Sequence, residues 1–282
     1  MRHMYGTLIC QIGLAAVCAT FVAAAAPAQA TDASAWAREN QAAMRLIAGS
    51  AKPGAKTLPA GIELELAPGW HTYWRYPGDS GLPPRFDFSG SRNLAAAKVS
   101  YPAPHLYTDE TGNTLGYKNH VIFPVSVTPK EPGQPVTLHV KIDYAICDKL
   151  CVPASGQAEL TLAPGTSANE AALAAAQARV PKPVAPTTLG LTLKRVSKDG
   201  KPAVTVDVKA AKDAPVQIFA EGPTADWALP VPKKTAGAPA GKRRFTFALD
   251  GLPPGVNPKA PAELTLTVVE GDKAYETKVH LD

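Results

Sequence analysis

The chain has 282 residues, 45% of them hydrophobic and 19% charged, with a formal net charge of +5 at pH 7. Apart from Lys233-Lys234 and Lys242-Arg243-Arg244, its basic residues are scattered without an accompanying aromatic stripe, which argues against a nucleic-acid-binding protein. Beyond the N-terminal region, no stretch approaches the roughly 18 apolar residues of a membrane-spanning helix. We therefore expect neither nucleic-acid binding nor membrane spanning.

Residues 1–30 have the pattern of a secretory signal peptide. Arg2 gives a positively charged start, residues 8–26 form an apolar run, and Ala28-Gln29-Ala30 offers small residues for cleavage. The sequence thus predicts cleavage after Ala30 and a protein located in the periplasm.

Two stretches, residues 31–165 and 188–282, alternate apolar and polar residues with a period of two. This alternation predicts strands that each bury one face. The 28 prolines and 22 glycines punctuate the chain at short intervals, which suits short strands joined by tight turns. We therefore expect an all-β protein with two immunoglobulin-like β-sandwich domains.

Residues 166–187 break this pattern. Ser167-Ala168-Asn169-Glu170 resembles a capping box, and residues 171–179 favour a helix. Prolines follow at positions 181, 183 and 186. The segment is predicted to be a short helix and a stiff, proline-rich linker between the two sandwiches.

Two cysteines remain in the mature chain, Cys147 and Cys151, because Cys10 and Cys18 lie in the signal peptide. In an oxidising compartment this pair can form a disulfide. Matching alternation on both sides places residues 147–153 in the connection of a β-hairpin, so we expect an exposed pair at a hairpin end.

Three interpretations of the pair stay open: thiol–disulfide exchange, a structural disulfide, and metal binding. A disulfide that closes about five residues is worth roughly 2 kcal/mol, against about 4.7 kcal/mol for a loop of about 100. So short a ring is also expected to be strained, and strained, exposed disulfides have the more oxidising potentials of exchange chemistry. Exchange is therefore favoured.

A Cu(I) site is the metal alternative, because thiolates are soft ligands. None of the other candidate ligands has metal-ligand spacing to the pair. They are Met44, His71, His105, His120, His139 and His280. We therefore predict no metal ligand and no cofactor.

Several motifs in the first half of the chain resemble one family. They are Gly69–Arg75, Pro77–Pro84, Gly116-Tyr117, Phe123-Pro124-Val125 and Tyr144–Pro153. In this order they are similar to the N-terminal periplasmic domain of the thiol:disulfide interchange protein DsbD, and the resemblance covers about Trp36 to Leu162. The cysteine spacing is closer to the relative ScsB, whose second periplasmic domain the second sandwich resembles.

The resemblance implies an immunoglobulin-like redox module with Cys147 and Cys151 as its catalytic residues. Such a module passes electrons to oxidised periplasmic partners, which are thioredoxin-like or disulfide-isomerase proteins. The sequence shows neither a membrane segment nor a thioredoxin-like domain, so a separate membrane electron transporter or thioredoxin-like protein is the expected donor. In this family the second cysteine, here Cys151, forms the mixed disulfide with partners, and Cys147 would resolve it.

Two features qualify this expectation. The family places an aromatic cap loop over its cysteines, whereas this sequence has Thr108-Asp109-Glu110-Thr111-Gly112 there. The cluster of Trp70, Tyr73, Trp74 and Tyr76 could shield the site, although ordinary core packing is favoured. Besides electron relay, a scaffold with a permanent disulfide and a Cu(I)-binding copper-tolerance protein stay open as functions.

Overall fold

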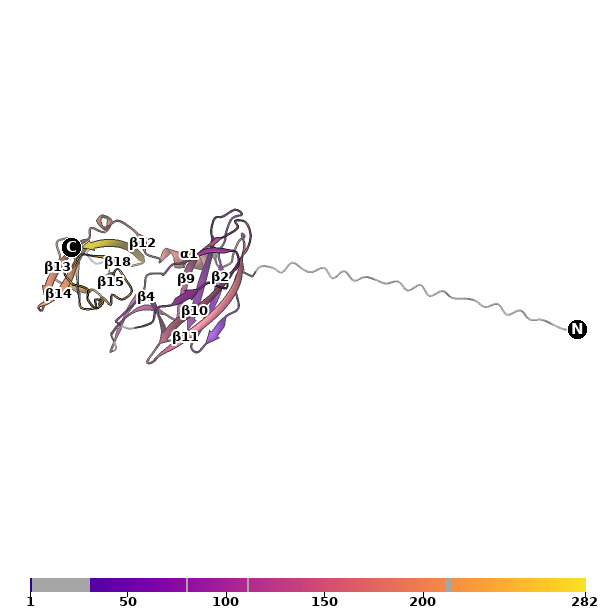
Figure 1. Ribbon diagram of the computed structural model, residues 1–282, viewed down its shortest axis with the longest axis horizontal. Coiled ribbons are helices and arrows are strands. Elements are labelled where there is room, and N and C mark those ends of the chain that lie inside the picture. Colours follow the sequence, from indigo (N-terminus) through magenta and orange to yellow (C-terminus); the bar gives the residue numbers. More distant parts are fainter. Residues whose placement is uncertain (2–30, 80, 111, 211–214) are drawn as a thin grey trace.

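The computed structural model describes Met1 and residues 31–79, 81–110, 112–210 and 215–282. The predicted signal peptide therefore lies almost wholly outside the described residues. The described chain forms two β-sandwiches that lie side by side (Figure 1), as the alternation predicts. No helix in these ranges is long and apolar enough to cross a membrane.

The first sandwich consists of two antiparallel sheets. Its strands are β1 (Ala37–Glu39), β2 (Ala42–Ala48), β3 (Leu58–Leu66), β4 (His71–Gly78), β5 (Arg85–Asp87), β6 (Leu94–Val99), β7 (His105–Asp109), β8 (Gly112–Lys118), β9 (His120–Pro129), β10 (Val136–Cys147) and β11 (Cys151–Leu162). One sheet has the order β1-β2-β3-β9-β6. The other has the order β11-β10-β4-β8-β7, with β5 also paired to β10.

Period-two alternation builds the core between these sheets. On β10, Val136, Leu138, Val140 and Ile142 are all 0% exposed, and Phe123 of the facing sheet is equally buried. Successive side chains on a strand point to opposite faces, so every second apolar residue enters the core. Strand β10 therefore runs along the centre of the sandwich and ends at the cysteine pair.

The second sandwich again has two sheets, with the orders β12-β19-β18-β15 and β13-β14-β17-β16. Its elements are β12 (Lys182–Pro183), the 3-10 helix η1 (Pro186–Leu189), β13 (Thr192–Lys198), β14 (Lys201–Lys209), β15 (Val216–Glu221), β16 (Lys233–Thr235), β17 (Lys242–Ala248), β18 (Ala262–Glu270) and β19 (Lys273–Leu281). Its own apolar core includes Val204, Val206, Leu264 and Leu266, all 0% exposed.

Between the sandwiches lies the helix α1 (Glu170–Ala178), close to where the sequence predicts it. Its buried Leu173 packs on Ile47 and Ile122 of the first sandwich. The helix therefore covers the outer face of the β1-β2-β3-β9-β6 sheet.

The predicted capping box does not form. The N-cap is Asn169, and its side chain makes no capping hydrogen bond. Ser167 Oγ instead donates to the carbonyl of Ala48, and Glu170 accepts a hydrogen bond from the backbone of Ser50. The loop after β2 thus engages the polar groups that would otherwise cap the helix.

The proline-rich segment, predicted to be a stiff linker, also forms a short strand. Strand β12 pairs in parallel with β19, with Lys182 opposite Tyr275 and Pro183 opposite Glu276. Pro183 is tolerated because β12 is an edge strand, where a missing N–H does not interrupt a ladder on both sides. The segment therefore pairs with the second sandwich a few residues after the end of α1, which packs on the first sandwich.

Candidate redox site

The cysteine pair closes the β10–β11 hairpin. The ladder runs without a break from Val136 opposite Leu162 to Cys147 opposite Cys151. The turn is therefore only residues 148–150, shorter than the connection of residues 147–153 that the sequence predicts. Pro153 is a ladder residue opposite Ala145, which an edge strand such as β11 permits.

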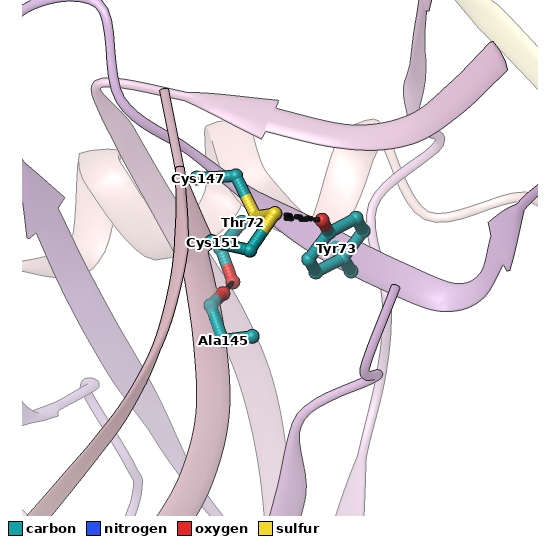
Figure 2. Close-up of a disulfide and its surroundings, with 5 residues drawn as sticks. All are labelled: Thr72, Tyr73, Ala145, Cys147 and Cys151. Atoms are coloured by element: carbon teal, nitrogen blue, oxygen red, sulfur yellow. Dashed lines mark hydrogen bonds between the residues drawn. A yellow bond between two sulfur atoms is a disulfide. The ribbon is translucent and has the colours of Figure 1, made fainter. Parts of the chain in front are cut away.

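Cys147 and Cys151 form a disulfide, with their Cα atoms 4.1 Å apart (Figure 2). The two residues differ sharply in exposure. Cys147 is 1% exposed and packs with Tyr73 and Ala145, whereas Cys151 is exposed. A partner approaching from solvent therefore meets Cys151 first.

Strand β4 lies beside this hairpin and carries the nearest side chains. His71 pairs with Cys147 and Thr72 with Ile146. The Thr72 hydroxyl donates to the carbonyl oxygen of Ala145 over 2.9 Å and is fully buried (Figure 2). These contacts fix the start of β4 against the cysteine-bearing strand.

Tyr73 brings a hydroxyl group to the disulfide. Its oxygen lies 2.7 Å from Cys147 Sγ and 3.4 Å from Cys151 Sγ (Figure 2). Sulfur in a disulfide carries no hydrogen, so the hydroxyl is the donor. Burial raises the pKa of Tyr73, and the negative charge of Asp109 raises it further. The hydroxyl therefore keeps its proton at neutral pH.

Gly81 packs directly against the Tyr73 ring. A Cβ atom at this position would lie 2.3 Å from the ring, and the residue has φ 132°. Both observations require glycine, because any side chain would collide with the ring and strain the backbone. Gly81 thus allows the chain to pack closely against the Tyr73 ring.

His71 is the second titratable neighbour and is 8% exposed. Its ring centroid lies 5.6 Å from that of Tyr73 and 6.1 Å from that of Tyr107. Burial lowers the pKa of His71, Lys118 lowers it further, and the carboxylates of Asp109 and Asp148 oppose this shift. We therefore take the imidazole to be neutral at pH 7.

The aromatic neighbour of His71 comes from a strand rather than from the expected cap loop. Tyr107 of β7 lies beside His71, and Lys118 Nζ lies 4.4 Å from the centroid of the Tyr107 ring. The Thr108–Gly112 segment supplies no aromatic residue, and its Thr111 lies outside the described residues. Tyr107 and His71 were missed as site residues, although His71 shares the strand face of Tyr73 through their two-residue spacing.

The aromatic cluster of the sequence divides between two roles. Tyr73 lies at the disulfide, whereas Trp74 is 0% exposed in the core, with its ring centroid 5.9 Å from that of Phe219. Trp70 and Tyr76 are partly buried against the same core. Core packing, the favoured expectation, holds for Trp74, and shielding of the site holds for Tyr73.

The candidate metal ligands do not gather. Across the described ranges, no group of three or more histidine, cysteine, aspartate or glutamate side chains is placed to hold a metal ion. Met44 is 0% exposed inside the first core.

The first sandwich is similar to a known protein family. Residues 40–163 match the family described as thiol:disulfide interchange protein DsbD, N-terminal. The crystal structure of the N-terminal periplasmic domain of ScsB from Proteus mirabilis is similar, with a TM-score of 0.68 and 18% sequence identity. The match covers 89% of this chain and 98% of that one, so the shared fold spans both sandwiches. None of the curated proteins matches the sequence.

Proposed function

We propose that the DsbD N-terminal domain formed by residues 40–163 relays electrons in the periplasm through the Cys147–Cys151 pair. It accepts them from a thiol donor, either a membrane electron transporter or a thioredoxin-like protein. It passes them to oxidised thioredoxin-like or disulfide-isomerase partners. The observation that carries this proposal is the asymmetric disulfide, with one exposed cysteine, Cys151, and one buried cysteine, Cys147, in contact with Tyr73.

Reduction of the site begins at the exposed sulfur. A donor thiolate attacks Cys151 Sγ and forms a mixed disulfide, while the bond between Cys151 and Cys147 breaks. Its electron pair leaves on Cys147 Sγ as a thiolate. The Tyr73 hydroxyl, 2.7 Å away, donates a hydrogen bond to this developing charge. A stabilised leaving thiolate departs faster, so Tyr73 accelerates this step.

The remaining steps transfer two electrons in all. The second thiolate of the donor attacks its own sulfur in the mixed disulfide, which releases Cys151 as a thiolate and leaves the donor oxidised. The Cys151 thiolate then attacks the disulfide of an oxidised partner. Cys147 resolves this second mixed disulfide, so that the partner leaves as a dithiol and the Cys147–Cys151 bond forms again.

Two exposed leucines lie next in the sequence to residues of the site. Leu150, which directly precedes Cys151, is 72% exposed, and Leu82, which follows Gly81, is 42% exposed. Apart from Met1, they are the exposed large apolar side chains in the described part of the chain. Single exposed apolar residues are common on protein surfaces, but these two directly adjoin Cys151 and the glycine that packs on Tyr73. We assign Leu150 and Leu82 to the partner contact.

A redox titration tests this function against the scaffold alternative, which the burial of Cys147 favours. The protein is equilibrated with glutathione buffers, trapped by alkylation, and the oxidised fraction is measured by mass. An exchange site has a potential above about −300 mV, within reach of periplasmic partners. A potential below that value identifies a permanent structural disulfide and refutes the relay.

Periplasmic location is a separate part of the proposal. It is supported by the signal-like pattern of residues 1–30 and by the periplasmic origin of the similar ScsB domain. The intact mass of protein from a periplasmic extract should correspond to a chain that starts at Thr31. A chain retained in the cytoplasm with residues 1–30 attached would contradict the assignment.

A further inference from the structure

Strand β4 has no paired residues directly after Tyr73, the tyrosine that contacts the disulfide. It pairs with β8 at His71, Thr72 and Tyr73, and then only at Gly78, after a register shift. Its pairing with β10 covers only His71 and Thr72. Within the described part of the chain, no strand therefore pairs with residues 74–77. The register shift therefore interrupts the regular ladder between β4 and β8 over this interval.

The second sandwich contacts the chain in this interval. Arg75 makes two hydrogen bonds to the carboxylate of Glu221 at the end of β15, over 2.9 Å and 2.7 Å. The same guanidinium forms an ion pair with Glu276 of β19. These two strands belong to one sheet of the second sandwich, and β4 lies on the side of the first sandwich that faces it (Figure 1).

The residues on either side of Arg75 add to this attachment. Trp74 packs on Phe219 of β15, and the Arg75 guanidinium lies 4.6 Å from the centroid of the Trp74 ring. The Tyr76 hydroxyl donates to the carbonyl oxygen of Leu229. Three consecutive residues thus bind the second sandwich where β4 has no strand partner.

The Arg75 cluster also has the geometry of an effective ion pair. The side chains of Arg75, Glu221 and Glu276 are 28%, 18% and 32% exposed, so they are partly shielded from water. Arginine bound to a carboxylate through two parallel hydrogen bonds is held in direction as well as in distance. This contact therefore orients β4.

We infer that the second sandwich positions Tyr73 on the disulfide by holding β4 through Arg75, Glu221 and Glu276. The inference rests on the role of Tyr73 in the proposed exchange function. Arg75 touches neither sulfur and acts as a positioning residue. The second sandwich thereby contributes to the chemistry of the first.

The test measures the rate at which dithiothreitol reduces the disulfide in the full-length protein, by alkylation and mass. The double variant Glu221→Gln/Glu276→Gln neutralises both carboxylates that hold Arg75. We expect its rate to fall about two- to tenfold, the effect of one weakened hydrogen bond to the leaving thiolate. Glu263→Gln is the matched control, because it removes an ion pair with Lys278 elsewhere in the same sheet and should leave the rate unchanged.

A mutant cycle separates positioning from general stabilisation. In a Tyr73→Phe background, the two glutamate changes should cause no further loss of rate, because the hydroxyl they position is already absent. If the glutamate and tyrosine effects are independent, or if the double variant lowers only the melting temperature, the inference is wrong.

Arg75→Lys provides a milder variant if the double variant does not fold, because it keeps the charge but loses the paired hydrogen bonds. It should slow reduction in the same way, and an unchanged rate in folded Arg75→Lys protein would overturn the inference. Because dithiothreitol is the reductant, these results do not depend on any protein partner. Failure of the proposed function would appear instead as a potential below about −300 mV.

Discussion

The Tyr73 hydroxyl lies closer to the sulfur of the buried Cys147, at 2.7 Å, than to the sulfur of the exposed residue Cys151, at 3.4 Å. The nearer sulfur is the one that leaves as a thiolate when a donor attacks Cys151. The shorter hydrogen bond from the Tyr73 hydroxyl is therefore made to Cys147 Sγ, the atom that gains negative charge in this step. This arrangement favours cleavage in one direction, with Cys147 as the leaving group.

The first prediction removes this hydroxyl. Tyr73→Phe should slow reduction of the disulfide by dithiothreitol about two- to tenfold, because one hydrogen bond to the leaving thiolate is lost. Tyr101→Phe is the control, since that hydroxyl binds the carbonyl of Pro84 away from the sulfurs. Equal rates in the Tyr73→Phe variant and the wild type would show that the hydroxyl does not assist the reaction.

The second prediction concerns partner contact. Burying a leucine side chain is worth about 1.5–3 kcal/mol, so Leu150→Ser should lower the exchange rate with a thioredoxin-like protein by about tenfold or more. Reduction by dithiothreitol should be unaffected, because the small reagent needs no apolar surface. Lys149→Ser, at the neighbouring turn position, serves as the control. If Leu150→Ser alters both reactions equally, the leucine acts on the disulfide rather than on the partner.

The third prediction follows from the depressed pKa of His71. An unfolded histidine binds a proton near pH 6.5, whereas folded His71 does so only at lower pH, so the unfolded chain gains protons first. The free energy of unfolding should therefore fall as the pH decreases below about 6.5, and His71→Gln should reduce this fall.

Urea unfolding of both proteins between about pH 5 and pH 8 measures the effect. His280→Gln, the same substitution at an exposed position, is the matched control. His105, whose pKa burial also lowers, should account for part of the dependence that remains in the His71→Gln variant. Identical curves for wild type and His71→Gln would contradict the prediction.

The fourth prediction tests the domain boundary at residue 165, which stays a prediction. Leu173 of α1 is buried against the first sandwich, so a fragment of residues 31–180 should be more stable than one of residues 31–165. We expect the free energy of unfolding to differ by about 2 kcal/mol or more, the usual cost of losing a buried leucine. Leu173→Ala in the longer fragment should remove most of the difference. If neither fragment folds, the sandwiches depend on one another.

Local patterns of the sequence predict much of this molecule. Alternation identifies β10 and β11, and the three-residue spacing together with the expected compartment predicts the disulfide that closes them. Both signals act over a few residues, where strand periodicity and chain reach determine the geometry. The family resemblance further predicts an immunoglobulin-like fold.

The rest depends on contacts between distant residues. Arg75 meets Glu221 across 146 positions, and no periodic pattern on either strand indicates that they will pair. The capping box failed for the same reason, because Ser167 bonds to Ala48, 119 positions away. The expectation that Pro153 lies outside the ladder was wrong. Proline is tolerated there because β11 is an edge strand, and that position depends on the order of strands in the sheet, which the local sequence does not indicate.

The last prediction assigns the two cysteines their roles. Cys151 is exposed, whereas Cys147 is 1% exposed beneath Tyr73, so a partner can form a mixed disulfide only with Cys151. Cys147→Ser leaves Cys151 free to react and removes the thiol that would resolve the product, so covalent complexes with periplasmic partners should accumulate. Cys151→Ser leaves only a buried thiol and should trap few complexes. Non-reducing electrophoresis compares the two variants: equal trapping would refute the assigned roles, and no trapping by either would favour a structural disulfide.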